Sequence, residues 1–268
     1  MLSFSTMATV ALAGDGSATV LHPLDRVLAA AAGAGFRGVA LDWFSLRAAE
    51  GAGVQLDAVA ERARDLGLVF TDLSALGLGS DAGSDGAASR SMARRCAALG
   101  IPVCALVLRV PPSPAVYERI SRCADTFGAA GVRLALEFVL YTAVCTLAEA
   151  EEVCARVGFE RCGLLVDTWQ LARSGGSPSD LAGLGPGEIS CVQVADAAAS
   201  PEPDVEHESR QGRLLPGDGV VDFPGFAAVL AGYAGAVGTE VLSSSLTRRP
   251  PEDVAGACIR AASAYFPA

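Results

Sequence analysis

The chain has 268 residues, a formal net charge of −10 and 51% hydrophobic residues, and its mean hydropathy is +0.39. The negative charge argues against nucleic acid as a partner, because phosphate binding requires clustered Lys and Arg side chains. No uncharged apolar run reaches the length of about 18 residues expected of a membrane span, and the N-terminus lacks the basic opening of a signal peptide. We therefore expect a cytoplasmic protein that binds neither nucleic acid nor membranes.

Apolar segments with strand character alternate along the chain with helical patterns rich in Ala, Leu and Arg. The predicted strands are 4–12, 38–44, 68–76, 102–110, 133–139, 163–169, 189–195 and 236–242. The predicted helices lie near 23–34, 54–66, 87–99, 114–130, 146–157, 178–184, 223–232 and 251–265. Strict alternation of this kind is typical of the (β/α)8 barrel. We predict a single-domain (β/α)8 TIM barrel over residues 1–268, a length that such barrels commonly have.

Two irregular segments follow predicted strands, on the face where barrel active sites form. Segment 77–86 reads G-L-G-S-D-A-G-S-D-G, and we interpret it as a solvated loop, with a mobile lid as the alternative. Segment 197–219 follows the seventh strand and ends in P-G-D-G. This tetrapeptide favours a turn over a phosphate-binding loop.

The eight cysteines form no C-x-x-C pair, and most of them lie in apolar runs. This pattern favours small buried hydrophobic side chains in a reduced compartment over disulfides or a structural zinc site. The residues are Cys96, Cys104, Cys123, Cys145, Cys154, Cys162, Cys191 and Cys258.

Four acidic or amide residues end the last four predicted strands. They are Glu137 in L-A-L-E-F, Asp167 in L-L-V-D-T-W, Gln193 in C-V-Q-V-A-D and Glu240 in V-G-T-E-V-L, spaced 30, 26 and 47 residues apart. Burying a charged group is costly without a partner. Neighbouring barrel strands would bring these oxygen atoms to a common point, where a hard divalent cation would offset the negative charge.

The donor set also predicts the kind of metal. Three carboxylates and one amide carbonyl suit Mg²⁺, Mn²⁺ or Co²⁺ better than Zn²⁺ or Cu²⁺. We therefore predict one divalent metal ion held by Glu137, Asp167, Gln193 and Glu240. Asp196 in V-A-D-A is an alternative to Gln193.

At these segments the chain resembles the xylose isomerase-like TIM barrels, the bacterial sugar phosphate isomerase/epimerase group. The resemblance is strongest over residues 133–245, and the matching segments are L-A-L-E-F, G-L-L-V-D-T-W-Q-L-A-R-S-G-G, C-V-Q-V-A-D-A, R-L-L-P-G-D-G and G-T-E-V-L-S. It implies that the four strand-end positions hold one divalent metal. The third ligand of that family is often His, but Gln occurs there in dehydroshikimate dehydratases of the same fold.

The chain departs from the family after the sixth strand, where D-x-x-H is replaced by D-T-W-Q and Gln170 stands in place of His. Gln cannot transfer protons, so we expect it only to orient substrate. The resemblance implies that Glu137 and Glu240 act as catalytic acids and bases and that Arg213 contacts substrate oxygens, with Arg210 as the fallback. His207, in the loop after the seventh strand, is a further candidate for substrate contact.

The resemblance and the ligand set together imply an isomerase or epimerase that moves a proton next to a carbonyl of a sugar, keto-sugar or polyol. Two alternatives stay open: a metal-dependent lyase or dehydratase similar to 3-dehydroshikimate dehydratase, and a repurposed ligand-binding barrel without the usual His. The expected partner is a small-molecule substrate, and homo-oligomerisation is left open.

Overall fold

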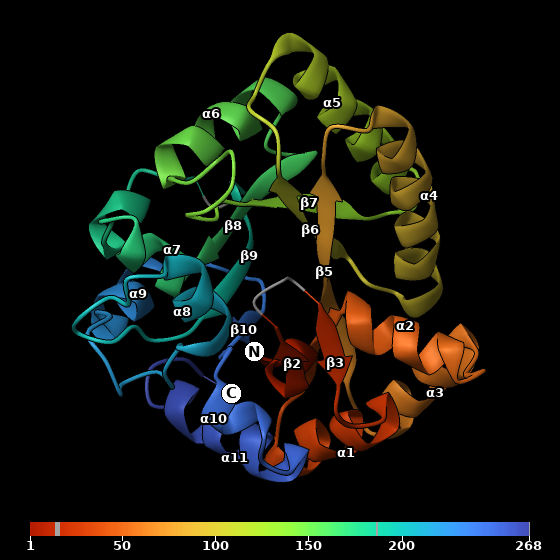
Figure 1. Cartoon of the computed structure of the whole chain (residues 1–268), viewed down its shortest axis with the longest axis vertical. Helices are drawn as coiled ribbons and strands as arrows, with labels where there is room; N and C mark the ends of the chain where they lie inside the picture. The colour runs from red at the N-terminus through yellow and green to blue at the C-terminus, as the bar shows by residue number, and fades with distance from the viewer. Residues whose placement is uncertain (14–16, 186, 268) are drawn as a thin grey trace.

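The computed structural model describes residues 1–13, 17–185 and 187–267. Eight parallel strands close into a barrel, in the order β1, β4, β5, β6, β7, β8, β9, β10 and back to β1, and the helices form a ring around it (Figure 1). The strands are β1 (Leu2–Ser5), β4 (Gly38–Asp42), β5 (Val69–Leu78), β6 (Val103–Leu108), β7 (Arg133–Glu137), β8 (Cys162–Asp167), β9 (Ile189–Val194) and β10 (Val237–Thr239). The predicted (β/α)8 barrel is confirmed.

The outer layer consists of amphipathic helices that end in the expected ways. Thr146 caps one of them in a capping box with Glu149, and Gly35 ends another with a φ of 104° that favours glycine. These helices are α1 (Leu24–Ala34), α3 (Leu56–Asp65), α4 (Ala82–Leu99), α5 (Pro114–Gly128), α6 (Leu147–Val157), α9 (Phe223–Val229) and α11 (Pro251–Ala262). None of the helices in the described part of the chain has the length and apolar character needed to cross a membrane. The helix predicted over 178–184 is a single 3₁₀ turn, η2 (Pro178–Leu181).

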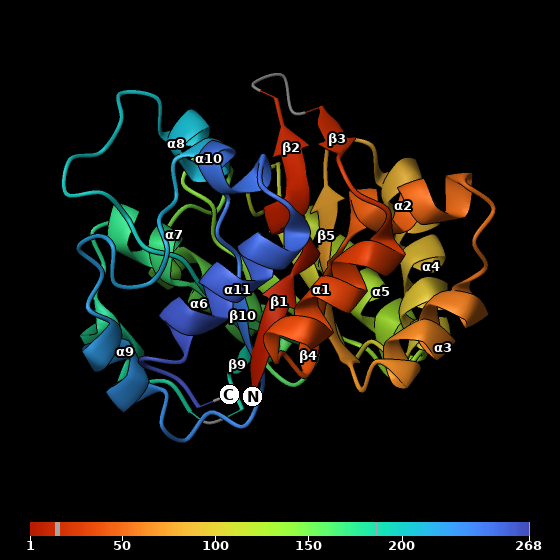
Figure 2. The same ribbon diagram turned by 90° about the horizontal axis from the view of Figure 1, so that it is seen from below.

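The strand predicted over residues 4–12 is divided into three elements. After β1 comes a 3₁₀ turn, η1 (Thr6–Thr9), and then β2 (Val10–Leu12), which pairs antiparallel with β3 (Ala18–Val20). The hydroxyl of Thr6 donates to Oδ2 of Asp42 and accepts from its backbone N–H, so this side chain competes with continued strand pairing. The hairpin stands at one end of the barrel, and both chain termini lie together at the other end (Figure 2).

Segment 77–86 is not the loop that its Gly and Ser content suggested. Strand β5 continues to Leu78 and α4 begins at Ala82, so only residues 79–81 connect them. Asp81 accepts from the N–H of Gly83 as the helix cap, and Asp85 accepts from the N–H of Gly79 and pairs with Arg119. The solvated loop predicted over 77–86 is therefore wrong, and the alternative of a mobile lid stays a prediction. Segment 197–219 likewise contains a helix, α8 (Val205–Gln211), that was not predicted.

Three more short helices were also missed: α2 (Trp43–Gly51) and α7 (Thr168–Arg173), which begin directly after strands, and α10 (Ser244–Thr247), which follows β10 after residues 240–243. Asp42 and Asp167 each end a strand and cap the helix that follows, because their carboxylates accept backbone N–H groups of its first turn. At these two positions the chain therefore turns sharply at the mouth of the barrel.

The barrel interior is filled by small and apolar side chains, among them Ala105, Ala135, Leu165 and Cys191. The outward faces of the strands pack against the helices, as in the contact between Phe4 and Phe36, whose ring centroids are 5.4 Å apart. All eight cysteines are unpaired and all but Cys145 are buried, as the sequence predicted. Interior and outward positions alternate along a strand. The residue two positions after the last interior side chain therefore also faces inward and lies at the mouth of the barrel.

Candidate metal centre

The four predicted ligands converge because each follows an interior position of its strand by two residues. Glu137 and Asp167 are the last residues of β7 and β8, Gln193 is the next-to-last residue of β9, and Glu240 directly follows β10. The period of two residues along a strand keeps all four side chains on the interior face. The interior residues that precede them are Ala135, Leu165, Cys191 and Gly238.

The carboxylates of Glu137, Asp167 and Glu240 form a compact acidic triad. Each offers one oxygen, and these three oxygens lie within 4.8 Å of one another. Nε2 of Gln193 donates to Oε1 of Glu240 at 3.1 Å, while Oε1 of Gln193 is buried and has no hydrogen-bond partner among the described residues. A buried acceptor without a donor is costly. Its position beside three carboxylates fits a hard cation, so these residues suit a divalent metal.

Arg213 is held inside this cluster. Its Nη1 donates to Oδ2 of Asp167 at 2.6 Å and lies 3.5 Å from Oε2 of Glu240. Its Nε donates to the backbone oxygen of Ser209 at 2.7 Å, and the guanidinium lies 5.2 Å from the centroid of the Trp169 ring. Only 2% of the residue is exposed. Arg213 therefore neutralises part of the triad and lies beside the predicted metal position.

The two glutamates of the centre, Glu137 and Glu240, have raised pKa values and so bind protons more tightly than ordinary carboxyl groups do. Burial is the main cause that raises the pKa of Glu137 well above its usual range, and the charges of Glu240 and Asp167 raise it further. Burial likewise raises the pKa of Glu240 to about 8, with opposing stabilisation of its charge by Arg213. Ionising this cluster is thus unfavourable without a compensating cation, which is what a divalent metal would supply.

A cavity of about 380 Å³ opens above the triad. Its apolar wall includes side chains from η1, β2, α2 and the segment after β10: Met7, Leu12, Trp43, Phe44 and Leu242. Its polar wall carries Arg109, Glu137, Tyr141, Gln170, Glu206, Arg210, Arg213 and Glu240. A polyol-sized molecule can thus contact both apolar and charged groups.

Gln170 is buried at the base of the polar wall. Its Oε1 accepts from the N–H of Leu140 at 3.2 Å and its Nε2 donates to Oγ of Ser209 at 3.4 Å. Both ends of the amide are therefore engaged by the protein. The structure brings Gln170 to the cavity, as predicted, and fixes its orientation.

His207 is not brought to the cavity, which corrects the expectation that it reaches the substrate. Its ring Nδ1 lies 2.6 Å from Oε2 of Glu202, and 49% of its side chain is exposed. Glu206 and Arg210 of the same helix line the cavity instead, because residues four apart share one helix face and His207 lies on another. Arg210 pairs with Glu206 at 2.6 Å and lies 5.5 Å from the centroid of the Tyr141 ring.

Asp196, the alternative to Gln193, organises the P-G-D-G turn. Its two carboxylate oxygens accept four backbone N–H groups at 2.8–2.9 Å, from Ala197, Gly217, Gly219 and Val221. A carboxylate with four donors has no lone pair left for a metal in this arrangement. The P-G-D-G tetrapeptide is a turn, as the sequence favoured, and Asp196 holds its backbone in place by hydrogen bonds.

Two charged residues of the region were missed from the sequence. Arg109 directly follows β6 and lines the cavity. Asp72 lies inside β5, is 4% exposed, and has one carboxylate oxygen, Oδ2, without a partner among the described residues. A charged residue within or at the end of an apolar run was the signal for Glu137 and Glu240, and the same signal was present for Arg109 and Asp72.

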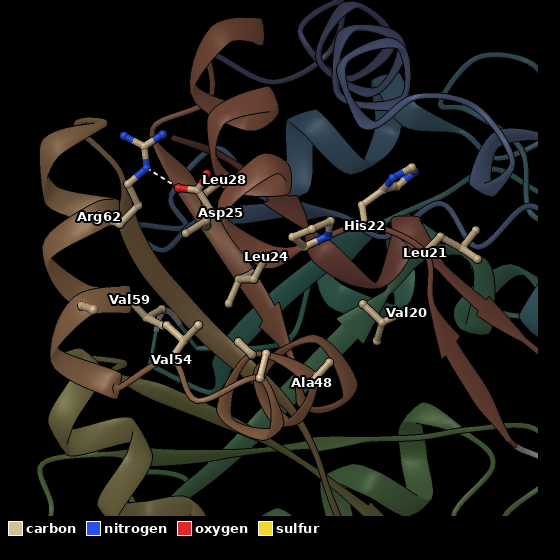
Figure 3. Close-up of a pocket in the computed structure, with 14 residues that line it drawn as sticks. Val20, Leu21, His22, Leu24, Asp25, Leu28, Ala48, Val54, Val59 and Arg62 are labelled. Carbon is tan, nitrogen blue, oxygen red and sulfur yellow. Dashed lines mark hydrogen bonds and ion pairs between the residues drawn. The ribbon is translucent and has the colours of Figure 1, made fainter.

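A larger cavity of about 550 Å³ lies elsewhere, outside the barrel (Figure 3). Helices α1, α2 and α3 and the end of the hairpin line it, mostly with apolar side chains such as Leu28 and Val59. Its charged groups are Asp25 and Arg62, which pair with each other at 2.5 Å. None of its lining residues belongs to the triad, so volume alone does not identify the functional site.

Comparisons with known proteins agree with this geometry. The family described as "Xylose isomerase-like TIM barrel" matches residues 28–262. A 3-dehydroshikimate dehydratase from Pseudomonas aeruginosa is 31% identical over 137 residues, which are 50% of this chain but only 21% of that protein. The chain thus spans about a fifth of the length of this curated relative.

Two solved structures share the fold over nearly their whole length. The IOLI protein, described with a binding zinc atom, superposes with a TM-score of 0.82 at 19% identity and covers 100% of this chain and 99% of its own. An L-ribulose 3-epimerase gives a TM-score of 0.73 at 19% identity, over 97% of this chain and 92% of its own. These two structures share the fold of this chain, and the feature of the chain itself that indicates a divalent metal site is the acidic triad.

Proposed function

Because the chain belongs to the xylose isomerase-like TIM barrel family, we propose that it is a divalent-metal-dependent isomerase or epimerase of a sugar, keto-sugar or related polyol. The observation that carries this proposal is the buried triad of Glu137, Asp167 and Glu240 beside the partnerless Oε1 of Gln193. Oxygen donors alone favour Mn²⁺, Mg²⁺ or Co²⁺ as the metal. The zinc of the IOLI protein is a property of that protein.

Glu137, Asp167, Gln193 and Glu240 would hold the metal, which when bound polarises a substrate carbonyl or hydroxyl. Glu137 and Glu240 both line the cavity, so each can take or give a proton at a substrate carbon through a carboxylate oxygen. Two such groups are what an epimerisation or isomerisation needs, because one removes the proton and the other returns it. Gln170 has no transferable proton of suitable acidity, and we assign it a role in shaping the cavity floor.

The second candidate is a metal-dependent dehydratase. It is supported by the amide ligand Gln193 and by the 31% identity to the Pseudomonas aeruginosa dehydratase over half of this chain. In that reaction one of the two glutamates would remove a proton and the other would protonate the departing hydroxyl. The two candidates share the metal and the acid–base residues and differ in whether water leaves.

The decisive experiment uses the Mn²⁺-loaded protein with a panel of ketoses and keto acids in D₂O. Deuterium incorporation next to the carbonyl, followed by NMR, supports the isomerase or epimerase. A rise in ultraviolet absorbance from a conjugated product supports the dehydratase. Glu240→Gln should abolish either signal, whereas Glu61→Gln, an exposed change on α3, should preserve it.

Two outcomes would contradict the proposal. If Mn²⁺ binds and no member of the panel gives either signal, the proposed activity on ketoses and keto acids is refuted. If neither Mn²⁺, Mg²⁺ nor Co²⁺ binds, the metal centre itself is refuted. A small-molecule substrate without nucleic-acid or membrane partners is part of the same proposal.

A further inference from the structure

Arg109 supplies the cavity with a positive charge that the protein does not neutralise. It follows β6, and its backbone N–H donates to the oxygen of Leu78 at 2.9 Å, which anchors it at the barrel mouth. Its guanidinium makes no hydrogen bond or ion pair with any residue that the structure describes, although it lines the cavity. The other two arginines of the cavity, Arg210 and Arg213, are both ion-paired.

Gly77 in β5 allows the side chain of Arg109 to reach this position. A Cβ placed on Gly77 would lie 2.9 Å from Nε of Arg109 and 3.6 Å from its Cδ. The arginine stem therefore lies directly against the β5 backbone, and a Cβ at position 77 would require its Nε end to shift. The fold thus positions the backbone of Arg109 and the base of its side chain, while the residue as a whole is exposed and open to a ligand.

The balance of charge around the cavity shows what this arginine can bind. A divalent cation together with Arg213 cancels the three carboxylates of the triad. Glu206 and Arg210 cancel each other. Among the charged groups that line the cavity, Arg109 then remains as the positive charge without a partner in the part of the chain that the structure describes. Asp72 does not line the cavity and lies within the strand layer below it.

We propose that Arg109 binds a carboxylate of the substrate, so that the substrate is a polyhydroxylated acid and not a neutral sugar. The guanidinium of Arg109 lines the cavity without a protein partner among the described residues, and its planar fork can donate two parallel hydrogen bonds to a carboxylate. This inference rests on the proposed metal-dependent function and names its substrate class. Arg109 is thereby a specificity-determining residue outside the metal ligand set.

The test compares matched probes on the Mn²⁺-loaded protein by calorimetry. Gluconate carries a carboxylate, sorbitol is its neutral counterpart, and sorbitol 6-phosphate carries a phosphate. We expect gluconate to bind about tenfold more tightly than sorbitol, the effect of one charge-assisted contact. Arg109→Gln should lose this preference, and Arg109→Lys should retain part of it because the charge remains without the planar fork.

Two further variants distinguish the effect of where the Arg109 guanidinium lies from the effect of its charge. Gly77→Ala keeps every charge but displaces the arginine, so it should reduce the gluconate preference without altering Mn²⁺ binding. Arg64→Gln removes an exposed arginine on α3 and should leave both probes unaffected. All four variants should bind Mn²⁺ as the unmodified protein does, since none of them changes a ligand.

Each failure has a distinct meaning. Equal binding of gluconate to the unmodified protein and Arg109→Gln, with Mn²⁺ bound to both, overturns the inference and leaves the proposed function standing. An Arg109-dependent preference for sorbitol 6-phosphate over gluconate overturns the carboxylate assignment in favour of phosphate. Absence of Mn²⁺ binding to the unmodified protein overturns the proposed function and this inference with it.

Discussion

Asp72 is a buried acid inside the barrel wall, and only one of its carboxylate oxygens has a partner among the described residues. Its Oδ1 accepts from the Thr71 hydroxyl at 2.8 Å, and the same hydroxyl lies 2.8 Å from that of Ser3. Its Oδ2 has no partner in the part of the chain that the structure describes. Burial raises the pKa of Asp72 to about 6, against the weaker opposing effect of the Thr71 hydrogen bond. Near neutral pH the fold therefore holds a largely ionised acid in an apolar setting.

This raised pKa has a defined effect on stability. A buried acid whose pKa is about 6 in the folded protein and about 4 when unfolded destabilises the fold as pH rises from about 4 to 6. We expect Asp72→Asn to be more stable than the unmodified protein at pH 8, by on the order of 2 kcal/mol, and to lose this advantage by pH 4. Urea denaturation at both pH values measures it. Asp65→Asn, an exposed change on α3, should show no such dependence.

Replacement of Glu240 should change metal affinity and the stability of the metal-free protein in opposite directions. Glu240→Gln keeps the shape of the side chain but removes a negative charge from the triad, so we expect Mn²⁺ affinity to fall at least about tenfold. The pKa of Glu240 is about 8, so its ionised form destabilises the metal-free protein as pH rises towards that value. Glu240→Gln should thus melt at a higher temperature than the unmodified metal-free protein at pH 9.

The ligand prediction fails if calorimetry finds the same Mn²⁺ affinity in Glu240→Gln as in the unmodified protein. Gln193→His provides the companion measurement, because imidazole is a good ligand for Mn²⁺, Co²⁺ and Zn²⁺ and should keep a metal bound. Loss of all metal from Gln193→His would show that the site cannot accommodate a ring at this position.

At the scale of elements, one carboxylate holds the long segment after β9 in place. Asp196 accepts from four backbone N–H groups, three of them in or just after the P-G-D-G turn. In Asp196→Asn the amide nitrogen cannot accept, so the N–H groups on one side lose their acceptor. We expect a loss of about 2–4 kcal/mol in the free energy of unfolding. Asp218→Asn, exposed in the same turn, should cost no more than about 0.5 kcal/mol.

The elements also show why some of the fold could be predicted from the sequence. The strands that carry ligands were predictable because their buried runs are long and end in a charged or amide residue, which marks both the strand and its mouth. The short helices α2 and α7 were not, because Asp42 and Asp167 serve as strand end and helix cap at once and the apolar pattern continues across the junction. The hairpin was missed since Thr6 directs the chain out of the barrel through tertiary contacts.

The candidate site, too, could be predicted from the sequence only in part. Glu137, Asp167, Gln193 and Glu240 could be predicted because strand periodicity alone brings them together. The exclusion of His207 depends on the face of α8 that packs towards the cavity, and α8 itself is held by tertiary contacts such as the buried ion pair of Arg173 and Glu208. The local sequence therefore does not determine which side chains of a short helix such as α8 point towards the cavity.

For the whole molecule, we expect the metal to bind only the closed barrel and therefore to stabilise the folded state. The four ligands come from β7, β8, β9 and the residue after β10, so the site exists only when this half of the barrel is assembled. Saturating Mn²⁺, at about 100 times its Kd, should add about 2.7 kcal/mol to the free energy of unfolding. We expect a rise of roughly 5–10 °C in Tm by scanning calorimetry. An unchanged Tm with Mn²⁺, Mg²⁺ and Co²⁺ alike would contradict a folded-state metal site.

Because the two chain termini are neighbours, the protein should tolerate circular permutation. Both ends lie side by side at the face of the barrel away from the hairpin (Figure 2). The ring of strands thus has no structurally required starting point. A circular permutant with the old ends joined by a short linker and new ends opened at residues 129–131, between α5 and β7, should bind Mn²⁺ with unchanged affinity. Reversible unfolding with lost metal binding would instead show that the position of the chain break matters for the site.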